Sequence, residues 1–83
     1  MKNLCLTIIW NACFLEMSGD DEIDPDSAVK ALESMAATMQ GATEEEKKMF
    51  VEVCAEEADR LKDVAGYSKT AEFVRKLPEA MGL

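Results

Sequence analysis

Residues 4–17 read LCLTIIWNACFLEM, and this stretch decides the fold. Only Thr7, Asn11 and Glu16 in it are not apolar. A helix that is apolar on nearly every side is typical of a buried helix. The sequence therefore predicts a helix over residues 2–17 at the centre of the molecule, covered by the rest of the chain.

The chain has 83 residues, so we expect a single helical domain over residues 1–83. Apolar residues make up 48% of it, a composition typical of a globular chain rather than a disordered one. A domain this short buries roughly 60–65% of the surface of its unfolded chain, so self-association is a common source of added stability. An uncovered part of the first helix, near Ile8 or Trp10, would favour a homodimer.

The three cysteines lie among apolar residues, at positions 5, 13 and 54. Cys5 and Cys13 are separated by about 12 Å along a helix, too far for a disulfide. An odd number of widely spaced cysteines indicates reduced thiols buried as small apolar groups, and we expect a cytoplasmic protein. The N-terminal run lacks a signal-peptide cleavage site, and about 14 residues are too few to span a membrane.

Three further helices are predicted. Asp24 is a good N-cap for a helix over residues 25–40, whose apolar face comprises Val29, Leu32, Met35, Ala36 and Met39. Thr43 and Glu46 form a capping box for a helix that we expect to end at Gly66. Its buried face is predicted to comprise Phe50, Val53, Cys54, Leu61, Val64 and Ala65.

The last predicted helix covers residues 68–76, because proline at position 78 disfavours helical geometry at Leu77. A short turn over residues 79–81 then follows. Strand and hairpin patterns are absent from the sequence. We therefore predict an all-α fold, a compact bundle of about four helices around a buried apolar N-terminal helix, plus a short C-terminal helical turn.

Two segments resemble a pattern found in short acidic bacterial proteins of unassigned function. They are CFLEMSGDDEIDPDSAV, residues 13–29, and AEFVRKLPEAMGL, residues 71–83. The resemblance covers roughly a third of the chain. It implies that these helix ends are a shared feature of the fold, and it implies no activity.

The sequence predicts no catalytic residue, no cofactor site and no metal site. Histidine is absent, which removes the commonest general base and the commonest zinc ligand. Asp20, Glu22 and Asp24 alternate like the first ligands of a calcium loop, but Pro25 stands where that loop needs glycine and Ala31 where it needs glutamate. We therefore interpret this segment as a solvated acidic loop, and the protein as not an enzyme.

The net charge of −8 predicts the kind of partner. Such a field repels nucleic acid and anionic membranes and attracts basic proteins. We expect a module that neutralises or occludes a basic protein, in the manner of an immunity protein or antitoxin. The alternative is a self-associating structural or regulatory helical module, in which the charge serves solubility. The candidate partner-binding residues are Asp20, Asp21, Glu22, Asp24 and Asp26 in the loop and Glu52, Glu56, Asp59 and Asp63 on the third helix.

The chain also has six methionines. Met35, Met39 and Met49 are candidates for an adaptable groove that binds a partner, because methionine side chains fill irregular surfaces. Filling of the core is the alternative role, and the one that we favour.

Overall fold

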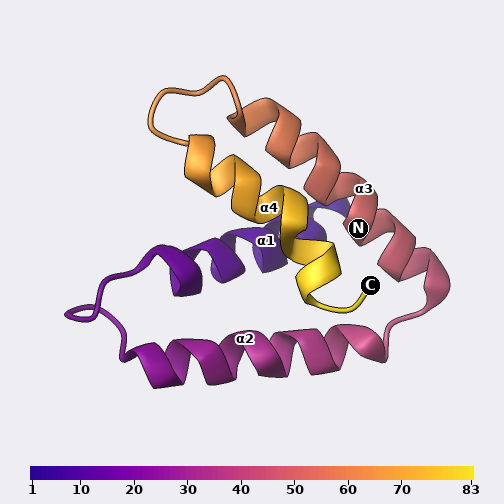
Figure 1. The fold of residues 1–83 in the computed structure, drawn as a ribbon. Coiled ribbons are helices and arrows are strands. Elements are labelled where there is room, and N and C mark those ends of the chain that lie inside the picture. Colours follow the sequence, from indigo (N-terminus) through magenta and orange to yellow (C-terminus); the bar gives the residue numbers. More distant parts are fainter.

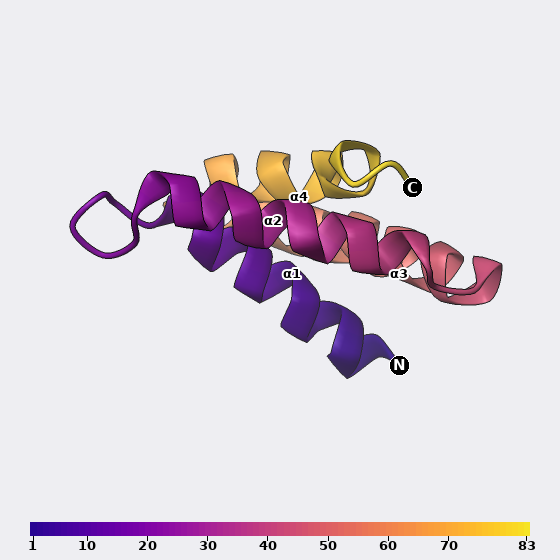
Figure 2. The ribbon, with the colours of Figure 1, turned by 90° about the horizontal axis from the view of Figure 1, so that it is seen from below.

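A computed structural model describes residues 1–83 as four helices and no strands (Figure 1). The helices are α1 (Lys2–Met17), α2 (Pro25–Gln40), α3 (Glu44–Leu61) and α4 (Ser68–Ala80). The predicted all-α bundle is confirmed. The helices α3 and α4 form an antiparallel pair, α1 crosses this pair, and α2 lies along one flank (Figures 1 and 2). None of the helices is both long and apolar enough to cross a membrane.

The hydrophobic core lies between α1, α3 and α4. It comprises Cys5, Ile9, Ala12, Cys13, Phe50, Val53, Cys54, Ala58, Leu61, Ala71, Val74, Leu77 and Met81. None of these residues comes from α2. That helix covers the core with four half-buried side chains, those of Leu32, Met35, Ala36 and Met39. Val29, the fifth residue of its predicted apolar face, is 53% exposed.

The helix α1 is buried on one side only, so the prediction that the other helices wrap it is wrong. Its buried residues are Cys5, Ile9, Ala12 and Cys13. By contrast, Leu4 is 63% exposed and Phe14 is 56% exposed. The cause is that α3 and α4 pack mainly against each other, while α2 reaches only one flank of α1. Three amphipathic helices therefore leave a whole face of α1 open.

The ends of α1 and α2 lie where the sequence predicts them, but α3 ends at Leu61 rather than Gly66. The next backbone hydrogen bonds close two β-turns. Val64 N–H donates to Leu61 O, and Tyr67 N–H donates to Val64 O. Gly66 then takes a left-handed φ of 83°. This tight connection returns the chain along α3, so Val64 and Ala65 are exposed rather than buried.

The helix α4 continues through Pro78 to Ala80, so the predicted separate C-terminal turn is its last turn. Leu77 is 3% exposed and Met81 is 5% exposed. Burial of both side chains favours a continuous helix and outweighs the local effect of the proline. Leu83 N–H donates to Pro78 O over 2.9 Å and closes the end of the chain.

The predicted N-caps of α2 and α3 are both present. The Asp24 carboxylate accepts a hydrogen bond from Ser27 N–H over 3.1 Å. Thr43 Oγ1 accepts one from Glu46 N–H over 3.1 Å, and the Glu46 carboxylate accepts one from Thr43 N–H over 2.8 Å. These bonds satisfy backbone donors that the first turn of a helix leaves free.

All three cysteines are free and buried in the core, as predicted. Burial raises the pKa of the Cys54 thiol to about 12, with a further contribution from the nearby Cys5 and Cys13. Burial also raises the pKa of Cys13 to about 11, with a smaller contribution from Glu57. Because the thiolate is the reactive form, we expect these thiols to react slowly in the folded state.

Candidate functional site

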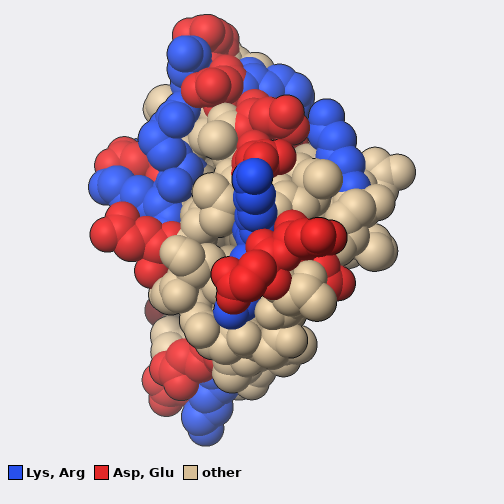
Figure 3. Space-filling model, turned by 90° about the vertical axis from the view of Figure 1, so that its right-hand side faces the viewer, with Lys and Arg blue, Asp and Glu red and all other residues tan.

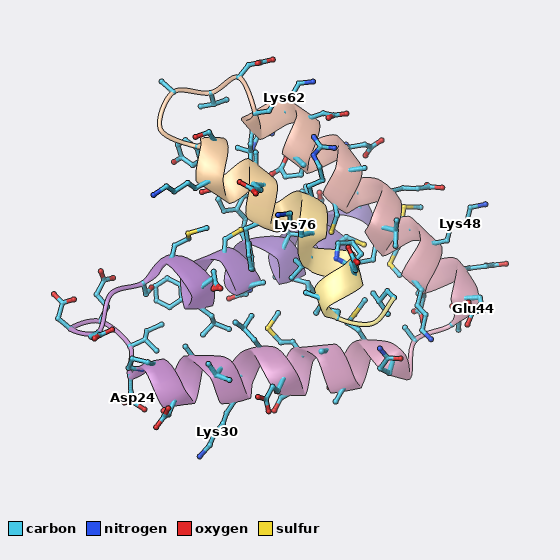
Figure 4. All side chains as sticks on the ribbon, viewed as in Figure 1. Asp24, Lys30, Glu44, Lys48, Lys62 and Lys76 are labelled. Carbon is cyan, nitrogen blue, oxygen red and sulfur yellow. The ribbon has the colours of Figure 1, made fainter.

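An open apolar groove runs between α2 and α4. It has a volume of about 250 Å³, and seven of its nine lining residues are apolar. The walls are Val29, Leu32, Glu33 and Ala36 of α2 and Phe73, Leu77 and Ala80 of α4, with Met81 directly after α4 and Glu16 from the last turn of α1. Figure 4 shows the two helices from the side, with α2 below α4.

The groove continues towards the loop that joins α1 to α2. A second hollow of about 270 Å³ shares Glu16, Val29 and Leu32 with the first. Its other lining residues are Leu15, Ser18, Asp20, Ile23, Pro25 and Ala28. Because the hollows share three residues, they form one surface, which we call the α2–α4 groove. It ends at the acidic loop over residues 19–26.

Both ends of α2 are fixed to the rest of the molecule. Ala28 in its first turns is the only buried residue of α2. At the other end, Gln40 Nε2 donates a 2.6 Å hydrogen bond to Met81 O, at the end of α4. Between these points, α2 faces α4 with Val29, Leu32 and Ala36, and these short side chains leave the space unfilled.

The sequence has no lysine or arginine between Lys2 and Lys30. Four of the five loop carboxylates make no salt bridge or hydrogen bond, namely Asp20, Asp21, Glu22 and Asp26. The fifth, Asp24, caps α2. Glu16 and Glu33 extend this charge along the groove. Of the five predicted partner-binding residues in the loop, Asp20 lines the groove, and the other four lie on the same loop.

The other four predicted residues lie elsewhere, on and just beyond the outer face of α3. In Figure 1 that helix and the acidic loop lie at opposite sides of the molecule. Figure 3 shows that Lys and Arg alternate with Asp and Glu on the α3 side. Arg75 donates a 2.7 Å hydrogen bond to Asp59 and holds the pKa of that carboxyl below its usual range. Glu56 pairs with Lys2 at 3.9 Å. The nine acids thus do not form one surface.

A further polar cluster at the edge of the core was not predicted. Glu57 of α3 is only 7% exposed. Its carboxylate accepts a 2.7 Å hydrogen bond from Trp10 Nε1 and bonds of 2.7 and 3.1 Å from Arg60. The Arg60 bonds, with help from Trp10, lower the pKa of Glu57. The sequence carries a signal for this cluster, because Glu57 follows Cys54 by three residues and precedes Leu61 by four, within the apolar face of α3.

This cluster fits a structural role better than a catalytic one. The Tyr67 ring packs edge-on against Trp10, with centroids 6.4 Å apart. Every polar atom of Glu57 is thus partnered, and its pKa is lowered, whereas a general acid at neutral pH needs a raised pKa. No three Cys, Asp or Glu side chains lie close enough to hold a metal ion.

The methionines of α2 do not line the α2–α4 groove. Met35 and Met39, with Ile8, Ser34 and Thr38, line a separate hollow of about 260 Å³. Both are half-buried against the core, which supports the core-filling role. Met49 lies on α3 and does not line this hollow.

Comparisons with protein-family models, curated proteins and solved structures found no match to this chain. The resemblance to short acidic bacterial proteins therefore stays a prediction. The function must be argued from the α2–α4 groove and its charge.

Proposed function

We propose that this protein is a small acidic binding module that holds a basic amphipathic segment of a protein partner in the α2–α4 groove. Binding would occlude the basic surface of that partner, as an immunity protein or antitoxin does. One observation carries the proposal: an open apolar groove ends directly at a loop that contains five carboxylates and no base.

The chemistry of the groove suits a helical ligand. An amphipathic helix places apolar side chains at i, i+3, i+4 and i+7 into a groove between two helices. Val29, Leu32 and Phe73 would contact that apolar side. Lysine or arginine on the flanks of the ligand would then meet Glu16, Asp20 or the neighbouring loop acids.

Charge and apolar contact have separate roles in this mechanism. The loop carboxylates attract a basic partner over a distance and speed its association. Apolar contacts inside the groove then slow its dissociation. Because the attraction is screened by salt, the association rate falls as ionic strength rises.

Fluorescence anisotropy with a labelled amphipathic peptide of leucine and lysine tests the proposal. The variant Asp20→Lys/Asp21→Lys should weaken binding at least about 10-fold. The matched control, Glu45→Lys/Glu52→Lys on α3, has the same change in net charge and should change the Kd less than about 2-fold at physiological salt. Equal losses in both variants would show attraction by net charge alone and contradict the groove.

A second pair of variants tests the apolar contact. Val29→Asp places a charge in the groove at a position that is already 53% exposed, so the fold is preserved. Val51→Asp makes the same change on α3, at a position that is 41% exposed. Only Val29→Asp should speed dissociation of the peptide. A pull-down from native lysate at low salt, followed by elution with salt, then identifies the basic partner.

A further inference from the structure

The open side of α1 forms a second surface, which we call the α1 open face. It comprises Leu4, Thr7, Trp10, Asn11, Phe14 and Met17, spaced so that they share one side of the helix. Four of these residues are large and apolar, and all four are at least 36% exposed. Glu16, which lines the α2–α4 groove, lies on the opposite side of α1 with Ala12 and Cys13. The apolar parts of the two surfaces are therefore separate, and the surfaces meet only at the acidic loop.

The polar groups on the α1 open face are already hydrogen-bonded to their own helix. Thr7 Oγ1 donates to Asn3 O over 2.9 Å. Asn11 Nδ2 donates to Thr7 O over 2.8 Å. Trp10 is held in place by Glu57 and by the ring of Tyr67. The side chains of this face are thus held in place before any partner binds. Covering the face therefore leaves few hydrogen-bond donors without an acceptor.

The distribution of charge on α1 indicates what covers this face. No charged residue lies between Lys2 and Glu16, so two copies of an acidic chain can approach through it with least repulsion. Lys2 precedes one end of the face in sequence, and the acidic loop follows the other end. Lys2 is 64% exposed and pairs only weakly, at 3.9 Å, within its own chain. An anionic membrane, in contrast, would be repelled by the net charge of −8.

We propose that the α1 open face binds a second copy of this chain, with the two α1 helices antiparallel about a two-fold axis near Trp10 and Asn11. This register places Leu4 opposite Met17 of the second copy, and Thr7 opposite Phe14. It also places Lys2 beside Asp20 and Asp21 of the second copy at both ends of the interface. A parallel pair would place Lys2 against Lys2 and one acidic loop against the other.

The size of the face determines the expected affinity. A helix of 16 residues is about 24 Å long. One such face, widened by Tyr67, is smaller than the roughly 800 Å² per partner of a standard interface. We therefore expect a dimer with a Kd of about 1–100 μM, at the weak end of specific association.

Sedimentation equilibrium from about 1 to 500 μM tests the proposal, because this range brackets the expected Kd. Phe14→Glu should raise the Kd at least about 30-fold. Val51→Glu, an exposed apolar-to-acid change on α3, should leave it within about 2-fold. Circular dichroism checks that both variants fold. A chain that stays monomeric throughout, or a dimer that is unaffected by Phe14→Glu, overturns the proposal. Binding of the monomer to zwitterionic lipid vesicles would instead assign the face to a membrane.

Charge reversal tests the antiparallel register. Lys2→Glu alone, and Asp20→Lys/Asp21→Lys alone, should each weaken the homodimer because like charges then meet at both ends. An equimolar mixture of the two variants should form a heterodimer, since both ends regain opposite charges. Within one chain these residues lie at opposite ends of α1, so the recovery can only arise between copies. If neither variant forms a weaker homodimer than the unchanged chain, the antiparallel register is wrong.

Discussion

The indole Nε1 of Trp10 donates a 2.7 Å hydrogen bond to Oε2 of Glu57, 47 residues further along the chain. The bond joins α1 to α3, and Arg60 completes the set of donors around the carboxylate. A buried carboxylate that loses its charge leaves these donors poorly partnered.

Glu57→Gln should therefore lower the free energy of unfolding by about 1–3 kcal/mol. Urea unfolding followed by the fluorescence of Trp10, the only tryptophan, measures this change. The neighbouring Glu56→Gln serves as the control. Its side chain is 65% exposed and pairs with Lys2 only at 3.9 Å, so its effect should stay below about 0.5 kcal/mol. Equal effects would contradict a structural role for Glu57.

Stability should also depend on pH through Glu57. Its pKa in the folded state is lowered, so the unfolded state binds protons first as the pH falls. The stabilisation is complete above the pKa of the unfolded chain and is lost as the pH falls through the lower pKa of the folded state. We expect a decline below about pH 4 that is shallower in Glu57→Gln. Unfolding free energies measured from pH 7 to pH 3 check this, and parallel curves would show that Glu57 does not contribute.

Gln40 fixes the C-terminal end of α2 to Met81 O. Gln40→Ala should speed amide hydrogen exchange in the second half of α2, and it should leave exchange in α3 unchanged. The expected loss of local stability is about 1 kcal/mol. Ser34→Ala, an exposed substitution in the same helix, is the control. Unchanged exchange in α2 would show that Gln40 does not hold this helix.

Loss of the N-cap of α3 should affect the stability of the whole molecule, whereas loss of the N-cap of α2 should affect that helix alone. Asp24→Ala and Thr43→Ala each remove a cap, which costs about 1 kcal/mol. The helix α3 carries much of the buried core, whereas α2 contributes none of it. Thr43→Ala should therefore lower the global unfolding free energy, and Asp24→Ala should mainly speed exchange at the start of α2. Chemical denaturation and hydrogen exchange together separate the two outcomes.

The three thiols should react only when the chain opens. Burial raises the pKa of Cys13 to about 11 and that of Cys54 to about 12, so almost no thiolate exists at pH 8. Reaction with Ellman's reagent should be at least about 100-fold slower in the folded protein than in denaturant. A thiol that reacts rapidly under native conditions would contradict the buried arrangement.

Much of the fold could be predicted because its signals are local. Asp24 and Pro25 mark the start of α2, and Thr43 and Glu46 mark the start of α3. The open side of α1 could not be predicted, because a helix that is apolar all round does not reveal which side its neighbours cover. The continuation of α4 through Pro78 depends on the burial of Leu77, which is a tertiary effect.

The candidate site was predictable only in part. The acids of the loop stand out in the sequence, but the adjoining groove depends on the distance between α2 and α4. The acids of α3 stand out equally. The sequence around the α3 acids does not reveal their ion pairs, because the partners Lys2 and Arg75 come from distant segments of the chain.

The absence of α2 from the buried core also has a consequence for folding kinetics. The helices α3 and α4 are neighbours in sequence and pack against each other most extensively, so this hairpin can form early. The helix α1 must then close a long loop to reach α3. Because α2 adds one buried side chain, that of Ala28, and otherwise half-buried ones, we expect it to dock after the transition state. Its substitutions consequently change the unfolding rate and leave the folding rate nearly constant.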